Sequence, residues 1–201
     1  MERNRVAAVL GGLALGLLAS SGGRAGEIVS QRAEMASAPA CIEVRSSAFS
    51  ANAPIPDRYS AYHENQSPPL EWSGAPERTQ AVALVVEDPD APGARPFVHW
   101  LVAAVPARVH ALPESLPDSP TLRAVGDAHQ GATSLGHTGW FGPRPPPGGP
   151  HHYHFQVFAL DAPVELSPGF DRDALVTAMK GHVLARGDLV ATYRRALDAA
   201  R

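Results

Sequence analysis

Uninterrupted apolar runs, each ended by turn-forming residues, predict three strands in the middle and late parts of the chain. The run 81–86 is wholly apolar and ends at the turn sequence Asp-Pro-Asp-Ala-Pro. The run 97–105 is apolar except for His99 and ends at Pro106. The segment 151–160 is rich in strand-forming residues and ends at Asp-Ala-Pro. Short runs of this kind, bounded by turn signals, are typical of buried strands.

Outside these three runs, the hydrophobic pattern gives weaker strand signals near the start of the chain and a helix signal near its end. Residues 42–44 and 55–59 are two further strand candidates. Near the C-terminus, Asp171 fits the N-cap of a helix over 173–180, which Gly181 would end. The following segment, HVLARGDLVATYRR, fits either a second helix or a short strand, because its periodicity leaves both open.

Proline usage limits the fold class. All 20 prolines fall between Pro39 and Pro168, and so many prolines exclude long helices from that region. Short strands joined by ordered loops are the alternative. The sequence therefore predicts one mostly-β domain, a sandwich, with helix only late in the chain.

The first 25 residues have the layout of a secretory signal. Arg3 and Arg5 precede an uncharged apolar run over 6–19, and small residues follow up to Ala25. The run is shorter than the roughly 20 apolar residues that a spanning helix needs, and no later segment could span a bilayer. We therefore expect a signal peptide over 1–25, a flexible leader over 26–40 and the folded domain over 41–201, with export to the periplasm or secretion.

The net charge limits the classes of partner that we expect, and the cysteine content indicates what stabilises the fold. The formal net charge is −3, and removing residues 1–25 takes away three Arg and one Glu, which leaves −5. A mildly acidic chain does not suggest nucleic acid or an anionic membrane surface as a partner. The single cysteine, Cys41, cannot form an internal disulfide, so an exported domain of this size depends on its hydrophobic core.

Polar residues that follow or begin the predicted strands form one candidate site. Asp88 and Asp90 stand in the turn after the first run, where a carboxylate either caps the turn's own backbone or orients an imidazole. His99 is a candidate for that imidazole. His151 and Tyr153 alternate onto one face of their strand, and His152 onto the other.

The stretch Gly142–Phe155, GPRPPPGGPHHYHF, joins a stiff loop to the last of these strands. Prolines fix φ and glycines let a ligand approach the main chain, so the loop suits the wall of a small polar pocket. A surface linker is the other interpretation of this composition.

Several chemistries compete for this set of residues. Two histidines and one aspartate could bind a metal, but no close-spaced ligand pair occurs. A hydrolase would need an activated nucleophile, and neither a G-x-S-x-G elbow nor a good role for Ser134 is found. Imidazole, phenol and loop N–H groups are all donors, which suits phosphate or carboxylate. An anion site without a metal or other cofactor fits best, and an acidic partner would raise the pKa of His99.

Four blocks of sequence resemble the phosphatidylethanolamine-binding protein family, in its bacterial Raf-kinase-inhibitor-like branch. In family order they are SPPLEW, VVEDPDAP, FVHWLV and GPRPPPGGPHHYHFQVFALD, and the ending GHVLARGDLVATYRR is also similar. The resemblance covers roughly residues 41–195. It implies an antiparallel β-sandwich with a small anion pocket near one end. The pocket residues that it implies are Asp88, His99, Gly142, Pro146, His151 and Tyr153.

The chain departs from the family pattern at three positions. His152 stands where the family usually has Arg, His63 stands where many bacterial members have Gly, and Arg144 takes a position often held by Gly or Ala. An Arg-mediated contact is thereby lost, while Arg144 either adds a cation at the rim or narrows the entrance.

Two classes of function follow as expectations. The first is an exported, non-enzymatic protein that binds a small anionic ligand: phosphate, a phospholipid headgroup or a carboxylate. In it, Asp88 orients His99, and both histidines and Tyr153 donate to the anion. The second, which the resemblance permits, is a surface-mediated inhibitor or regulator of a protease or kinase, with a protein partner. A small hydrolase remains a minor alternative.

Overall fold

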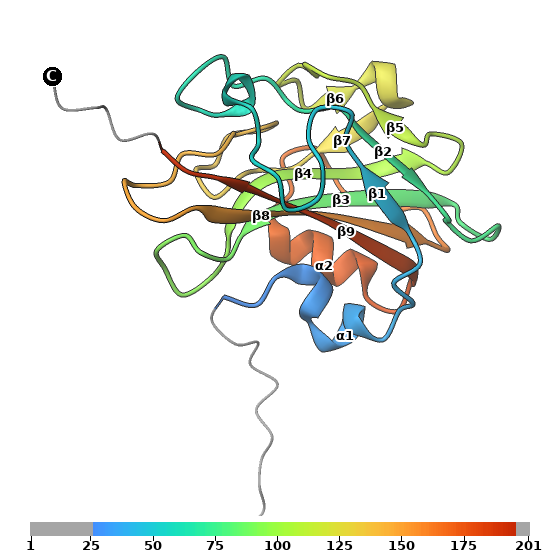
Figure 1. The fold of residues 1–201 in the computed structure, drawn as a ribbon. Coiled ribbons are helices and arrows are strands. Elements are labelled where there is room, and N and C mark those ends of the chain that lie inside the picture. The colour runs from blue at the N-terminus through green and yellow to red at the C-terminus, as the bar shows by residue number, and fades with distance from the viewer. Residues whose placement is uncertain (1–25, 196–201) are drawn as a thin grey trace, which may run out of the picture.

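Residues 26–195 are described by a computed structural model, in which two antiparallel sheets pack face to face (Figure 1). The larger sheet has six strands in the order β6-β7-β4-β3-β8-β9, and the smaller has three in the order β1-β2-β5. All pairs of neighbouring strands are antiparallel. The predicted mostly-β sandwich is therefore confirmed.

The elements are short, as the proline content predicts. The strands are β1 Glu43–Arg45, β2 Leu70–Ser73, β3 Ala81–Asp88, β4 Phe97–Pro106, β5 Ala111–Leu112, β6 Thr121–Leu122, β7 Ala128–Gln130, β8 His151–Leu160 and β9 Val183–Tyr193. The α-helices are α1 Ala33–Ala36 and α2 Arg172–Met179. The 3-10 helices are η1 Val29–Gln31, η2 Asp57–Tyr59 and η3 Arg123–Val125.

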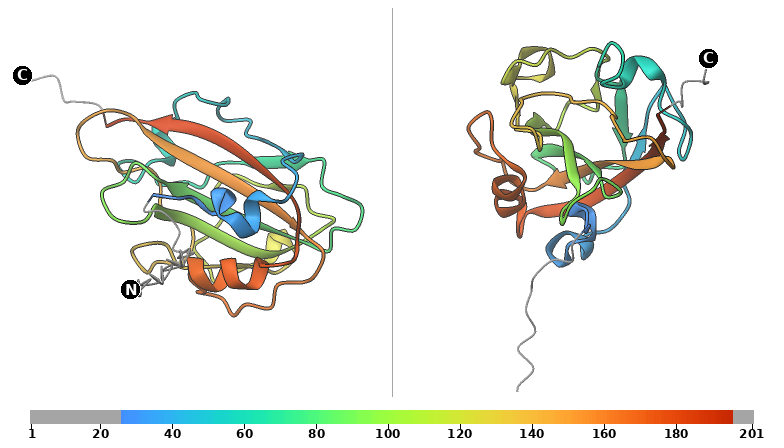
Figure 2. Two further views of the ribbon diagram at one scale, coloured as in Figure 1. Left: turned by 90° about the horizontal axis from the view of Figure 1, so that it is seen from below. Right: turned by 90° about the vertical axis from the view of Figure 1, so that its left-hand side faces the viewer.

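Strand β3 is apolar on both faces because it lies at the centre of three layers. Val82 and Leu84 face the core between the two sheets. Ala83 and Val85 face a second core that α2 and the N-terminal segment cover. Figure 2 shows α1 and α2 on the face of the large sheet opposite β1 and β2. Alternate side chains of a strand point to opposite faces, so double burial explains the unbroken apolar run.

The C-terminal predictions are confirmed where the signals are local. The Asp171 carboxylate caps α2 by accepting a 2.8 Å hydrogen bond from the Ala174 amide. Gly181, just beyond the helix, has φ +82°, which glycine adopts without strain. The segment that fitted either a helix or a strand is β9, which pairs with β8 along its length.

The prediction of a strand over 55–59 is wrong, because this segment contains the 3-10 helix η2. Pro54 and Pro56 have no N–H to donate to a ladder. The contact with β9 is a single isolated bridge between Pro54 and Thr192, in which the Ile55 amide donates to the Thr192 carbonyl at 2.7 Å.

The segment 26–40, expected to be a flexible leader, is instead packed against the large sheet. It contains η1 and α1, and Val29 and Met35 are fully buried. The buried Glu87 carboxylate accepts from the Val29 amide at 2.8 Å and from Arg172 Nε at 2.5 Å. Most residues of the segment are small or polar. Its few buried apolar side chains and the buried ion pair nevertheless hold it against the large sheet.

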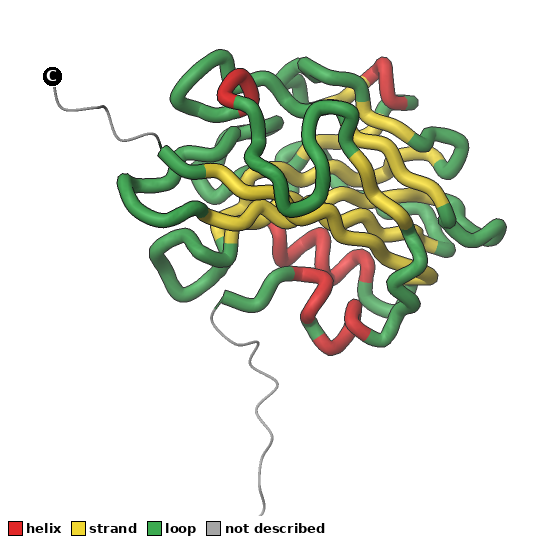
Figure 3. Tube along the Cα trace, viewed as in Figure 1, coloured by secondary structure: helices red, strands yellow, loops and turns green. Residues whose placement is uncertain are grey.

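The predicted signal peptide, residues 1–25, lies outside the described residues. Within residues 26–195, no helix combines the length and apolar character that a membrane span needs. The loops that join the strands gather at the two ends of the sheets (Figure 3). One of these ends carries the candidate site.

Candidate functional site

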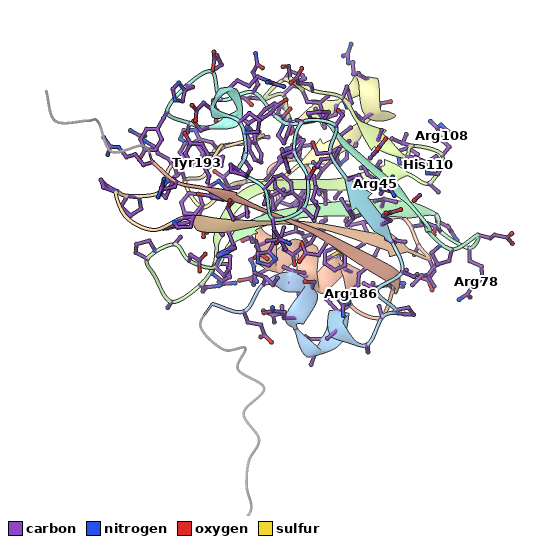
Figure 4. All side chains as sticks on the ribbon, in the orientation of Figure 1. Arg45, Arg78, Arg108, His110, Arg186 and Tyr193 are labelled. Carbon is purple, nitrogen blue, oxygen red and sulfur yellow. The ribbon has the colours of Figure 1, made fainter. Side chains whose placement is uncertain are left out.

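A cavity of about 290 Å³ opens where the end of β3 and the starts of β4 and β8 meet two loops. Antiparallel pairing brings Asp88, Phe97 and His151 to this one end of the sheet, although they lie far apart in sequence. In Figure 4, Tyr193, whose register partner is His151, marks this end, and Arg78 marks the opposite end. The cavity is lined by Asp88, Ala91, Pro92, Phe97, His99, Leu135, Phe141, Arg144, Pro145, Pro146, His151 and Tyr153.

Asp88 is held in a fixed position at the cavity. Its Oδ1 accepts hydrogen bonds from the amides of Asp90, at 2.8 Å, and Ala91, at 3.1 Å. Its Oδ2 lies 2.8 Å from Nδ1 of His151. Burial raises the pKa of Asp88, and the hydrogen bond from His151 and the backbone amides oppose that rise. Asp88 therefore both caps the turn and orients an imidazole.

The imidazole that Asp88 orients is His151, so the expectation that it orients His99 was wrong. A carboxylate on Nδ1 keeps a proton on that nitrogen and directs Nε2 away from the carboxylate. The His151 side chain is 12% exposed and lines the cavity. Its Nε2 is consequently the atom that can meet a ligand.

His99 occupies a bulge in β4. Val86 pairs with Trp100 and Glu87 pairs with Val98, so His99 is an extra residue opposite the step between them. Bulges of this kind redirect a side chain and are frequent beside functional sites. Here the bulge brings the rings of His99 and Trp100 to the same neighbour, Trp140, at centroid distances of 6.4 and 5.7 Å.

His99 is neutral. Its Nδ1 lies 2.5 Å from the Phe141 carbonyl, which can only accept, so Nδ1 carries the proton. Burial among aromatic rings lowers its pKa to about 4, and the nearby His151 adds to this effect. The expected rise in pKa was therefore wrong, because no carboxylate pairs with this ring. At neutral pH, Nε2 of His99 is an acceptor.

Tyr153 presents a buried hydroxyl to the cavity. The residue has no exposed surface, and no group in the described residues meets the full geometry of a hydrogen bond with its Oη, although the Asp88 carboxylate is close to it. Burial raises the pKa of Tyr153, and the charge and close approach of Asp88 raise it further. The hydroxyl therefore keeps its proton at neutral pH. An unpaired buried hydroxyl costs folding free energy, so this group points to a ligand.

Hydrogen bonds with residues 61–65 hold the proline-rich loop in place as a wall of the cavity. Tyr62 Oη donates to the Pro145 carbonyl at 2.6 Å, and the Ala61 amide donates to the Pro143 carbonyl at 3.1 Å. The Gly142 amide donates to Asn65 Oδ1 at 2.7 Å. The loop is thus held from outside the cavity.

Gly142 is the one predicted site residue that does not line the cavity. A Cβ added to it would lie 2.0 Å from the Tyr59 carbonyl oxygen, so only glycine fits this close approach. Its role is to let the wall pack against η2. Pro146 lines the cavity, as do Asp88, His99, His151 and Tyr153.

The neighbouring histidines of β8 face the other way, as alternation along a strand predicts. His152 pairs with Asp90 at 2.7 Å and His154 with Asp188 at 2.8 Å, both outside the cavity. Arg144 lines the cavity, and its guanidinium lies 5.7 Å from the centroid of the Tyr62 ring. It is therefore a cation at the rim.

Sequence reasoning missed the apolar part of the lining. Phe97, Phe141 and Leu135 contribute to the wall, and Leu135 is 53% exposed. Their only sequence signal is position: Phe97 begins the strand of His99, and Phe141 directly precedes the proline-rich loop. No group of three or more His, Cys, Asp or Glu within residues 26–195 is arranged to hold a metal ion.

The fold and the site together define a β-sandwich protein with a small cavity, lined by polar and aromatic side chains, at one end of its sheets. A model of the family described as phosphatidylethanolamine-binding protein matches residues 45–194. The chain belongs to the phosphatidylethanolamine-binding protein family.

Relatives and solved structures agree with this assignment. A UPF0098 protein of Methanothermobacter thermautotrophicus is 38% identical over 154 residues, which is 77% of this chain and 99% of that protein. The crystal structure of Escherichia coli YbcL, described as a new member of the mammalian family, matches with a TM-score of 0.73 and 29% identity, over 78% of this chain and 100% of that one. A putative family homologue from Chlamydia trachomatis matches with a TM-score of 0.70 and 32% identity, over 78% and 99% of the two chains.

Proposed function

We propose that this chain is an exported, non-enzymatic binding protein whose cavity takes a small anion. The ligand would be phosphate, a phosphate-bearing headgroup or a carboxylate. The observation that carries the proposal is the Tyr153 hydroxyl, a fully buried donor with no protein partner in the described residues, which lines the cavity beside His151. A ligand oxygen would satisfy it.

The charges around the cavity support an anion. His151 is held by Asp88 so that Nε2 can donate when the ring is protonated, and this pair is then neutral overall. Arg144 adds a cation at the rim, and no second carboxylate lines the cavity. Its size of about 290 Å³ is at the lower end of the range for ligand sites. A small headgroup fits these limits better than a large substrate.

A binding role is also consistent with the chemistry of the lining. None of the lining residues, all of them in the described part of the chain, is a serine, threonine, cysteine or lysine. The Asp88–His151 pair therefore has no aliphatic hydroxyl, thiol or amine beside it to activate, and the phenol of Tyr153 is a poor nucleophile because burial raises its pKa. The family's name also describes a binding protein. We expect no turnover of a generic phosphomonoester by the pure protein.

Export is proposed from the sequence of residues 1–25. Two arginines, an apolar run and small residues precede the folded segment that begins near Glu27. The destination would be the periplasm or the medium. Expression of the complete chain, followed by fractionation and N-terminal sequencing of the product, tests both export and cleavage after Ala25.

Calorimetric titration with phosphate and phosphoethanolamine tests the binding role. We expect saturable heat that is lost in His151→Ala and kept in His182→Ala, because His182 is an exposed histidine that pairs with Asp161 far from the cavity. No heat with either ligand would overturn the anion role and direct the search to a protein partner.

A further inference from the structure

The buried carboxylate of Glu87 connects the N-terminal segment, residues 26–40, to the cavity. Glu87 and Asp88 are neighbours at the end of β3, and Glu87 contacts the N-terminal segment while Asp88 contacts His151 in the cavity. We infer that Glu87, with the N-terminal segment bound to it, is a positioning residue for the Asp88–His151 pair. Release of the segment then loosens the pair and weakens ligand binding. The statement about ligand binding rests on the proposed function, whereas the statement about the pair does not.

The ladder between β3 and β8 ends at Glu87. Glu87 lies opposite His154 and is the last residue of β3 that has a register partner in β8. Asp88, one residue further along, has its register partner, Phe97, in β4. It nevertheless reaches His151, the first residue of β8. The pairing of β3 with β8 therefore does not fix this contact, and the contact depends on how the chain beside Asp88 is held.

Three donors hold the Glu87 carboxylate, and one of them belongs to the N-terminal segment. The Val29 amide and Gln156 Nε2 both donate to Oε2 at 2.8 Å, and Arg172 Nε donates to Oε1. The Glu87 side chain has no exposed surface. A buried carboxylate that loses a donor is destabilised unless it moves to another donor or to water. The Val29 amide and the position of Glu87 are therefore coupled.

The same group of buried side chains binds the main chain of the N-terminal segment at two more points. The Ser30 amide donates to Gln156 Oε1 at 2.6 Å, and Arg172 Nη2 donates to the Glu27 carbonyl at 2.9 Å. Figure 2 shows this segment on the same face of the large sheet as α2. Segments at a chain end that dock through a few contacts can open as a unit. The docked and released states of this segment differ in the donors that they offer to Glu87.

One substitution removes the donor from the segment and leaves the side chain of Glu87 unaltered. Val29→Pro deletes the amide that binds Glu87. The preceding residue, Ile28, already has φ −71° and ψ 160°, an extended conformation that suits a residue before proline. The first residue of a helical turn, which Val29 occupies in η1, also tolerates proline. Val29→Ala is the matched control, because it keeps the amide and shortens the buried side chain.

NMR of the purified protein labelled with ¹⁵N-histidine, without ligand, measures whether the pair is held. The Nδ1 proton of His151 points to a carboxylate, and that of His99 points to the Phe141 carbonyl, so both should exchange slowly with water. The Phe141 amide also donates to the His99 carbonyl at 3.0 Å, which fixes His99 through Phe141. In Val29→Pro the His151 proton should exchange about fivefold faster or more, and the His99 proton should keep its rate. In Val29→Ala both protons should keep their rates.

Two outcomes of this measurement would overturn the inference. Unchanged exchange of the His151 proton in Val29→Pro would show that the segment does not position the pair. Equal acceleration for His151 and His99 would show a general loosening of the fold instead. Met35→Ala gives a second test if Val29→Pro does not fold, because it removes a fully buried side chain of the segment but no donor to Glu87. It should accelerate the His151 proton selectively as well.

Calorimetric titration with phosphate separates this inference from the proposed function. Phosphate affinity should fall about fivefold or more in Val29→Pro and stay within about twofold in Val29→Ala. Unchanged affinity in Val29→Pro, despite a faster His151 proton, would overturn the control of binding by the segment. If phosphate does not bind to the unaltered protein, the anion role fails, and the exchange rates still decide whether Glu87 and the segment position the Asp88–His151 pair.

Discussion

Asp88 Oδ2 lies 2.8 Å from His151 Nδ1, and this contact joins the end of β3 to the start of β8 at the cavity. The pair orients the His151 ring so that its Nε2 can meet a ligand. Asp88→Asn keeps the shape but replaces a charge-assisted hydrogen bond with a neutral one. We expect phosphate affinity at pH 6 to fall about tenfold, since a charge-assisted hydrogen bond is roughly twice as strong as a neutral one.

A matched control exists on the opposite face of β8. Asp90 makes a similar contact with His152, at 2.7 Å, but both side chains are largely exposed and lie outside the cavity. Asp90→Asn should leave phosphate affinity within about twofold. An equal loss in both variants would show that general charge, rather than the Asp88–His151 pair, determines affinity.

The hydroxyls of Tyr153 and Tyr193 have different roles in this account. The Tyr153 hydroxyl binds the ligand, and the Tyr193 hydroxyl stabilises the fold. Tyr193 Oη contacts Asp57 at 3.0 Å and Ser60 at 3.1 Å, whereas Tyr153 Oη has no partner in the described residues. Without ligand, Tyr193→Phe should lower the free energy of unfolding by about 1–2 kcal/mol. Tyr153→Phe should leave it unchanged or raise it, while weakening phosphate binding about tenfold.

Urea unfolding in phosphate-free buffer measures both stabilities, and calorimetry measures both affinities. If Tyr153→Phe lowers stability as much as Tyr193→Phe does, the Tyr153 hydroxyl serves the fold, and its role as a ligand donor would be contradicted.

The neutral His99 predicts acid sensitivity. Its pKa falls from 6.5 to about 4 on folding, so between these values the unfolded chain binds the additional proton. Its contribution to stability is therefore complete above pH 6.5 and is lost as the pH falls to about 4, by roughly 3 kcal/mol at most. The raised pKa of Asp88 acts in the opposite sense.

A variant isolates the His99 effect. The free energy of unfolding of His99→Phe, measured from pH 7 to pH 4, should have a flatter pH dependence than that of the unaltered protein. His182→Gln, which changes an exposed histidine, should keep the original slope. Identical slopes in His99→Phe and the unaltered protein would show that His99 is not kept neutral by the fold.

The buried Glu87–Arg172 pair predicts how the N-terminal segment is held. The Glu87 side chain has no exposed surface, and Arg172 Nη2 also donates to the Glu27 carbonyl at 2.9 Å. Arg172→Met leaves a buried, unpaired carboxylate and should cost about 3–5 kcal/mol. The double variant with Glu87→Gln should recover part of that loss. No recovery would mean that the charges act separately. Denaturant unfolding gives all the free energies required.

The strands and the cavity residues were predictable because their signals are local. The apolar runs of β3, β4 and β8 and the turn after Asp88 are continuous in sequence, and the family resemblance identified His99, His151 and Tyr153. The partner of Asp88 was not predictable, because the bulge at His99 and the register of β8 decide which imidazole meets it. The N-terminal segment was missed because its burial depends on contacts with Glu87 and Arg172, which are distant in sequence.

The most direct measurement of the central claim is a crystal structure of the protein with arsenate, a phosphate analogue that anomalous scattering locates without ambiguity. The account predicts one strong arsenic peak in the cavity, with arsenate oxygens about 2.6–3.0 Å from Tyr153 Oη and His151 Nε2. Arsenic only at surface arginines, or a cavity without arsenic at saturating concentration, would contradict it.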